Sequence, residues 1–121
     1  MLFRSVYMDN IFKQTLLYDF YGELLNEHQR KVYEDAVFND LSLSEVADNY
    51  GVSRQAIHDL IKRVTKMLEK YENKLHMIER FAKMQDIAQG IKDTIAEYKE
   101  SRNDKLLDKI SEDTELIIDE F

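Results

Sequence analysis

The stretch from Leu41 to Arg63 (LSLSEVADNYGVSRQAIHDLIKR) constrains the fold more than any other part of the chain. Ser42 and Glu45 have the spacing of a capping box, which predicts the start of a short helix. Gly51 follows at a point where the backbone can adopt a positive φ without steric cost. Ser53 is a suitable N-cap for a second helix. The pattern therefore predicts a helix-turn-helix.

Apolar residues of this stretch lie where two crossing helices need a core. They are Val46, Tyr50, Val52, Ile57, Leu60 and Ile61. Ala47 is small at the point where the helices would approach most closely, and Val52 is expected to fill the gap between them. The alternative to a nucleic-acid role is a helical hairpin that only holds proteins together, because a motif match is a hypothesis.

The composition favours an all-α protein. The 121 residues include no proline and three glycines, and 34% of them are charged. This length corresponds to one domain, or to a small domain with a helical extension. The absence of cysteine excludes disulfides and cysteine metal sites, and it makes the reducing cytoplasm the expected location. No apolar run is long enough for a membrane span, so no membrane partner is expected.

Two helices are predicted before the motif, and three helical segments are predicted from Arg54 onward. Residues 12–25 have an i, i+4 apolar pattern that includes Leu24 and Leu25, and Asn26 with Gln29 forms a second capping box. Apolar residues then recur every seven positions in two interleaved rows, at Ile61, Leu68, Leu75 and Ala82 and at Val64, Tyr71 and Ile78. This seam predicts one helix from Arg54 to about Lys83.

The apolar register shifts near residues 82–84, which predicts a break there. A helix to about Glu100, a turn over 101–104 and a last helix carrying Leu107, Ile110, Thr114 and Ile117 are expected to follow. We therefore expect a helix-turn-helix domain with a long helix over residues 1–82. Residues 83–121 are expected to form an acidic helical hairpin that serves in dimerisation or packing.

Charge is distributed unevenly along the chain. The net charge is −7, but residues 50–83 carry eight Lys/Arg against four Asp/Glu, a local excess of +4. Residues 1–49 and 84–121 are acidic, at −5 and −6. Acidic flanks weaken non-specific phosphate binding, so this pattern tolerates a nucleic-acid role without proving it.

Catalysis has little support. His28, His58 and His76 are dispersed, so no two of them have metal-ligand spacing, and there is no glycine-rich phosphate loop. His58 and Asp59 are adjacent, so on a helix their side chains diverge by about 100°. We expect no enzyme activity, no catalytic residues, no cofactor and no metal site.

The outward face of the second motif helix carries the candidate nucleic-acid-binding residues: Ser53, Arg54, Gln55, His58, Asp59, Lys62, Arg63 and Lys66. Arg54 could pair with guanine and Gln55 with adenine, while Ser53 at the helix start suits a phosphate. The basic residues at 62, 63 and 66 would contact the backbone. Asp59 could accept from cytosine, or it could repel phosphate and indicate a face that meets protein. The other interpretation of the whole face is a solvated helix surface.

Two sets of residues carry a resemblance to known families. SLSEVADNYGVSRQAIHDLIKR, preceded by HQRKVYEDAVFNDL, is similar to the promoter-reading region 4 of bacterial sigma factors. Together with LYDFYGELL upstream and YENKLH downstream, it resembles the YlxM family more closely, over roughly residues 15–80. These are small bacterial proteins encoded beside signal recognition particle genes. His58 and Leu60 depart from that family's pattern, where Tyr and Asn are more usual, which puts a base contact at position 58 in doubt.

The resemblance implies an all-helical homodimer with sigma-like DNA-binding helices, acting as a regulator in the signal recognition particle pathway. The alternative function is a module that does not bind DNA and associates instead with the protein or RNA of that particle. In either case the expected protein is a non-enzymatic, cytoplasmic binding protein.

Overall fold

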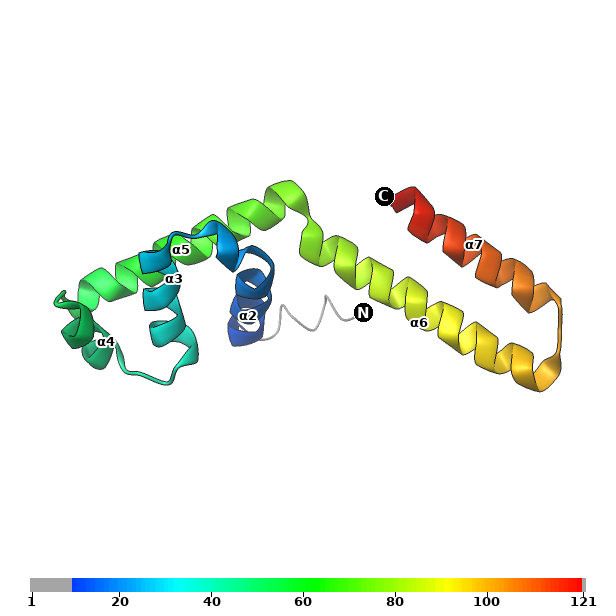
Figure 1. Ribbon diagram of the computed structural model, residues 1–121, viewed down its shortest axis with the longest axis horizontal. Helices are drawn as coiled ribbons and strands as arrows, with labels where there is room; N and C mark the ends of the chain where they lie inside the picture. Colours follow the sequence, from blue (N-terminus) through cyan, green and yellow to red (C-terminus); the bar gives the residue numbers. More distant parts are fainter. Residues whose placement is uncertain (1–9, 121) are drawn as a thin grey trace. The chain divides into compact units, whose positions relative to one another are not determined.

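The computed structural model describes residues 10–120, and all regular structure in this range is helical, which confirms the all-α class (Figure 1). The elements are α2 (Asn10–Tyr21), the 3₁₀ turn η1 (Gly22–Leu24), α3 (Glu27–Tyr33), the π-helical turn η2 (Glu34–Phe38), α4 (Leu43–Tyr50), α5 (Arg54–Leu75), α6 (Met77–Ser101) and α7 (Lys105–Glu120). The chain divides into two compact units between Ile78 and Glu79. Between residues 10 and 120, no helix has both the length and the apolar character that a bilayer span requires.

The capping box predicted upstream of the motif is present at the start of α3. The Asn26 side chain accepts from the Gln29 N–H at 2.8 Å, and the Gln29 side chain accepts from the Asn26 N–H at 3.1 Å. The two bonds satisfy N–H groups that the helix itself cannot pair.

The helix before it is shorter than predicted. α2 gives way to the 3₁₀ turn, where Gly22 packs so closely on the Tyr18 ring that an added Cβ would lie 3.0 Å from ring carbons. This turn redirects the chain, so that Leu25 is buried but Leu24 is 56% exposed. The expectation that Leu24 belongs to the buried stripe was wrong.

The predicted helix-turn-helix is present as α4 and α5. The Ser42 hydroxyl accepts from the Glu45 N–H at 3.1 Å, and the Glu45 carboxylate accepts from the Ser42 N–H at 3.4 Å. Gly51 has a φ of 67°, the left-handed conformation that glycine adopts without a Cβ penalty. The Val52 N–H then donates to the Ala47 carbonyl at 3.0 Å and closes the end of α4. Local capping chemistry thus explains the sharp turn.

The core of the first unit joins these helices. Its buried apolar residues are Leu17, Tyr21, Leu25, Val32, Tyr33, Val46, Ala47, Ile57, Leu60, Val64, Leu68 and Ile78. Most of them come from α2, α3, α4 and α5, whereas Leu25 lies between η1 and α3 and Ile78 lies in α6. α5 is thus held on one side by three other helices and leaves its opposite side to solvent.

Ser53→Ala is expected to lower the free energy of unfolding by about 1 kcal/mol, because the Ser53 hydroxyl accepts from the Ala56 N–H at 3.0 Å and caps α5. Urea denaturation followed by circular dichroism measures this loss. The matched control is Ser44→Ala at an exposed position inside α4, where little change is expected. Equal losses for the two variants would argue against the cap.

The main departure from the sequence prediction is the position of the break in the long helix: it was predicted near residues 82–84, but α6 is continuous there and the break lies at His76. α5 ends at Leu75, and His76 has a φ of 55°, so the single helix predicted from Arg54 to about Lys83 was wrong. Val64 and Leu68 are fully buried, whereas Leu75 is 48% exposed. The seven-residue repeat therefore does not form one continuous seam.

Side chains from α2 and α5 stabilise this break. The Tyr21 hydroxyl accepts from the Met77 N–H at 3.1 Å and donates to the Glu72 carboxylate at 2.5 Å, which also accepts from the Ile78 N–H at 2.9 Å. Burial and the hydrogen bond to Glu72 raise the pKa of Tyr21 to about 12, which keeps its phenol protonated as a donor. N–H groups at the start of α6 thus find partners without an uninterrupted helix.

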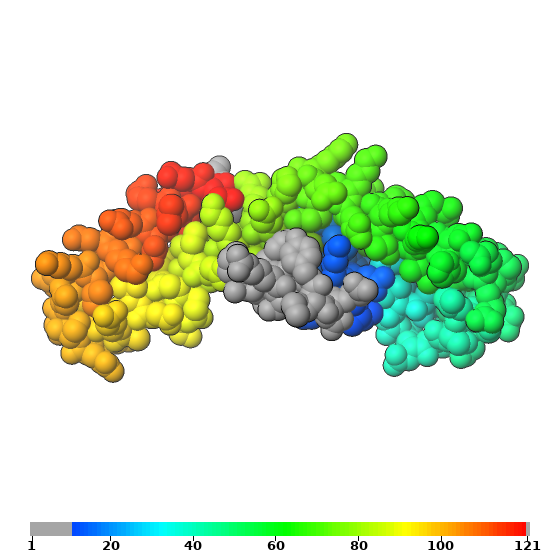
Figure 2. Space-filling model, turned by 180° about the vertical axis from the view of Figure 1, so that it is seen from behind, coloured from blue at the N-terminus to red at the C-terminus, as the bar shows by residue number. Residues whose placement is uncertain are grey.

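The second unit contains the predicted C-terminal hairpin. α6 and α7 run antiparallel and lie side by side (Figures 1 and 2), with the turn over residues 102–104 close to its predicted place. The Glu120 carboxylate accepts from Lys83 at 3.0 Å and from Arg80 at 3.3 Å. The hydrogen bond from Lys83, together with the charges of both basic residues, holds the pKa of Glu120 below its usual range. These contacts tie the end of α7 to α6.

Candidate nucleic-acid interface

The eight predicted site residues all lie on exposed positions at the start of α5 or just before it. They are Ser53, Arg54, Gln55, His58, Asp59, Lys62, Arg63 and Lys66. Ile57, Leu60 and Val64 point into the core between them, so the helix is anchored on its inner side. Lys66 is the twelfth residue after Arg54, a distance of about 18 Å along the axis. The structure brings the predicted residues together along the exposed part of one helix.

The first turns of α5 contain a hydrogen bond that links two of the predicted residues. The Gln55 Nε2 donates to the Asp59 Oδ1 at 2.9 Å, and both side chains are exposed. The same Asp59 oxygen lies 3.8 Å from the His58 Nδ1, which is beyond hydrogen-bonding distance. Asp59 is therefore engaged mainly with Gln55.

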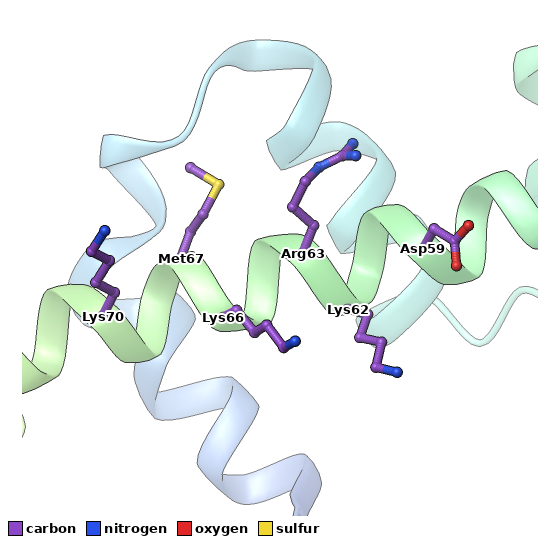
Figure 3. Close-up of a pocket in the computed structure, with 6 residues that line it drawn as sticks. All are labelled: Asp59, Lys62, Arg63, Lys66, Met67 and Lys70. Carbon is purple, nitrogen blue, oxygen red and sulfur yellow. The ribbon is translucent and has the colours of Figure 1, made fainter.

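Farther along α5, basic side chains surround a shallow groove of about 410 Å³. It is lined by Asp59, Lys62, Arg63, Lys66, Met67 and Lys70 (Figure 3). Arg63, Met67 and Lys70 point to one side of the helix and Lys62 points away from them (Figure 3). Lys70 was missed by the sequence prediction, although its spacing of four residues from Lys66 would have revealed it.

The acidic residues of α5 do not neutralise this basic surface evenly. Glu69 lies 3.7 Å from Lys13 of α2, and Glu72 is bonded to Tyr21 of the same helix. Asp59 is thus the acidic residue of α5 that lies among the basic ones. The outward face therefore carries a net positive charge that suits a polyanion.

A second groove of about 340 Å³ lies beside the turn, and it corrects the prediction for Val52. Val52 is 46% exposed and lines this groove with His28, Tyr50 and Ala56, so it does not fill the gap between the motif helices. The gap is closed by other buried side chains of α4 and α5. Val52 is held in its place by its backbone bond to Ala47 and not by side-chain burial.

The fold and the exposed basic helix define a helix-turn-helix protein. The chain belongs to the UPF0122 family, described as "helix-turn-helix protein, YlxM / p13 like", whose pattern matches residues 8–113. A UPF0122 protein of Halalkalibacterium halodurans is 42% identical over 88 residues, covering 73% of this chain and 81% of the relative. The corresponding protein of Clostridium kluyveri is 40% identical over 103 residues, covering 85% and 93%. One from Thermoanaerobacter sp. is 37% identical over 113 residues, covering 93% and 97%.

These findings confirm the expected family and its helix-turn-helix class. They concern the family and fold class of the protein and do not test the roles of single residues. The roles assigned above to Arg54, Gln55 and their neighbours therefore remain predictions.

Proposed function

We propose that this protein is a DNA-binding regulator that reads duplex DNA with the first turns of α5. Arg54 and Gln55 would meet base edges in the major groove, with guanine and adenine as their preferred partners. Ser53 would lie against a phosphate at the helix start, and Lys62, Arg63 and Lys66 would contact the backbone. We place this activity in the cytoplasm, because a chain without cysteine suits a reducing compartment.

One observation carries this proposal: the inner side of α5 is buried in the core, while its outer side is exposed and becomes basic from Lys62 onward. A helix held in this way keeps its outward side chains in fixed relative positions, which base recognition requires. An exposed basic helix without such anchoring would supply charge but no register on the DNA.

The test is binding of the full-length protein to duplex DNA from its own promoter region across a salt series. We expect the logarithm of the binding constant to fall linearly with the logarithm of salt concentration. Lys66→Ala is expected to reduce that slope by roughly one, because one phosphate contact is lost. Lys109→Ala, an exposed lysine of α7, is the matched control and should leave the slope unchanged. A salt-independent affinity would contradict DNA binding.

We also propose that the protein acts as a homodimer, through one face of the α6–α7 hairpin. α7 contains no buried residue among those described, although it is strongly amphipathic in sequence. Ala88 and Ile95 of α6 and Leu107 and Ile118 of α7 are exposed. Around the axis of each helix, the row of exposed apolar residues lies about 90–100° from the residues that face the other helix. The direction of this rotation is the same for both helices. In an antiparallel pair the two rows therefore fall on one side of the hairpin.

The charges of the hairpin favour a second copy as the occupant of this face. By the same helical geometry the acidic residues of α6, such as Asp86, Asp93 and Glu97, lie away from the apolar row. Two copies could therefore bury their apolar rows without bringing these carboxylates together. A dimer would also present two α5 helices, and helix-turn-helix dimers read half-sites about 34 Å apart.

Ile95→Lys is expected to convert the dimer to a monomer, because it would place a charge in the apolar face. Sedimentation velocity at micromolar concentration measures the change. Glu97→Lys, which adds a lysine on an exposed position of the same helix outside the apolar row, is the control and should remain dimeric. A native protein that sediments as a monomer would rule out the dimer and leave the DNA proposal standing.

The second candidate function is association with the signal recognition particle, which the family resemblance implies. The exposed apolar row and the net charge of −6 over residues 84–121 would suit a basic partner surface. Pull-down with the protein and the RNA of the particle separates this candidate from the first. We expect Ile95→Lys to reduce recovery and Lys66→Ala to leave it intact. Recovery of neither component with the native protein would exclude it.

A further inference from the structure

Asp59 is the residue of the α5 surface whose charge fits nucleic-acid binding least. A carboxylate among Lys62, Arg63 and Lys66 weakens their attraction for phosphate. Its hydrogen bond among the described residues is the 2.9 Å bond that it accepts from Gln55, one helical turn before it. That contact gives Asp59 a different role from either a base acceptor or a repulsive charge.

The chemistry of the two side chains makes this bond directional. An ionised carboxylate only accepts hydrogen bonds, so the Gln55 amide must turn its NH₂ group and not its oxygen toward Asp59. The side-chain oxygen of Gln55 and the second hydrogen of its NH₂ group remain for another partner. A glutamine needs one acceptor and one donor to bind the N6 and N7 positions of adenine. The bond to Asp59 therefore fixes the positions of the acceptor oxygen and the remaining donor hydrogen of the Gln55 amide, which adenine requires.

We propose that Asp59 is a positioning residue, which holds the Gln55 amide in the orientation that reads adenine. This inference rests on the proposed DNA-binding function and adds a specificity determinant to it. Ordering a flexible side chain at an interface opposes binding, and Asp59 imposes that order before DNA arrives. The carboxylate lowers affinity for DNA in general and raises the preference for one base pair.

The two effects have opposite signs, which makes the proposal testable. The probe is a duplex DNA library with a randomised central segment, bound by the full-length native protein and by its variants, followed by sequencing and by affinity measurements on the enriched and on unrelated duplexes. For Asp59→Ala we expect the preference for A·T at one position to fall roughly two- to tenfold. Affinity for unrelated duplexes should rise, because a negative charge has been removed.

Two further variants separate the hydrogen bond from the charge. Asn at position 59 keeps an oxygen that can accept from Gln55 but carries no charge, so Asp59→Asn should retain more of the base preference than Asp59→Ala. Asp59→Asn and Asp59→Ala should both gain affinity for unrelated duplexes. In a Gln55→Ala background, Asp59→Ala should not change the base preference further, since the two residues act as one unit. Thermal melting checks that each exposed substitution leaves the fold intact.

Three results would overturn the inference. Asp59→Ala could raise affinity for all sequences equally and leave the base preference unchanged, which would reduce Asp59 to a repulsive charge. Asp59→Ala could alter the preference equally in the Gln55→Ala background, which would make Asp59 itself the base contact. If the native protein enriches no sequence, the proposed reading of DNA fails and this inference fails with it. If a sequence is enriched, only the inference is under test.

Discussion

Leu68→Ala is expected to lower the free energy of unfolding by about 2–5 kcal/mol, the range for truncating a large buried aliphatic side chain. Leu68 is fully buried in α5. α5 packs against α2, α3 and α4, so the cavity left by the substitution lies inside the core that orders the first unit. Urea denaturation at fixed protein concentration measures the loss.

Leu75→Ala is the matched control, because both leucines belong to the same seven-residue row in the sequence. Leu75 is 48% exposed, so we expect a loss of about 1 kcal/mol or less. A continuous coiled-coil seam would predict similar losses at the two positions. The break at His76 predicts unequal ones. Comparable losses would show that Leu75 is covered in solution and that α5 and α6 behave as one helix.

The helix-turn-helix could be predicted because its signals are local. The capping box at Ser42 and Glu45 and the N-cap at Ser53 act within three residues, and Gly51 forms the turn by itself. The exposure of Arg54 and Gln55 follows from helical periodicity once the inner row of α5 is known. Signals of this kind involve residues that are close in the sequence, so they can be recognised without knowledge of any tertiary contact.

The break at His76 could not be predicted in the same way. No glycine or proline marks it, and the apolar repeat runs across it without interruption. The contact that stabilises it joins Tyr21 to Glu72, which are 51 residues apart. Histidine is among the residues that adopt a positive φ more often, but this tendency is too weak to locate a helix end. A tertiary hydrogen bond therefore decided a boundary that periodicity placed elsewhere.

Interactions within the candidate site were predictable in part. The spacing of Gln55 and Asp59 is the i, i+4 spacing at which such side chains bond, and the structure shows that bond. The charge of Asp59 alone does not predict its presence among the basic residues on the outward face of α5. Lys70 was not predicted, although it lies one helical turn after Lys66 and lines the same groove. Val52 was assigned to the core on its apolar character, although the turn geometry leaves it at the surface.

Ala47→Leu is the second substitution with a large expected effect, a loss of about 1–3 kcal/mol from overpacking. Ala47 is 3% exposed and lies on α4, which packs mainly against α5. Its carbonyl also accepts the Val52 N–H that closes the turn. Three additional carbon atoms at this crossing must push the two helices apart or force a strained rotamer, and either response also moves the Gln55 side of α5 relative to α4.

The same enlargement at an exposed position provides the control. Ala56 lies in the first turn of α5 and is exposed, so Ala56→Leu should change stability by no more than about 0.5 kcal/mol, as should Gln55→Ala. Thermal and urea unfolding of the three variants compare a tight crossing with a free surface in one motif. Because overpacking requires close helix contact, a loss for Ala47→Leu that does not exceed those of the two controls would mean that α4 and α5 cross with room to spare. The proposal that packing against α4 holds α5 in a fixed position, on which base recognition depends, would then lose its structural basis.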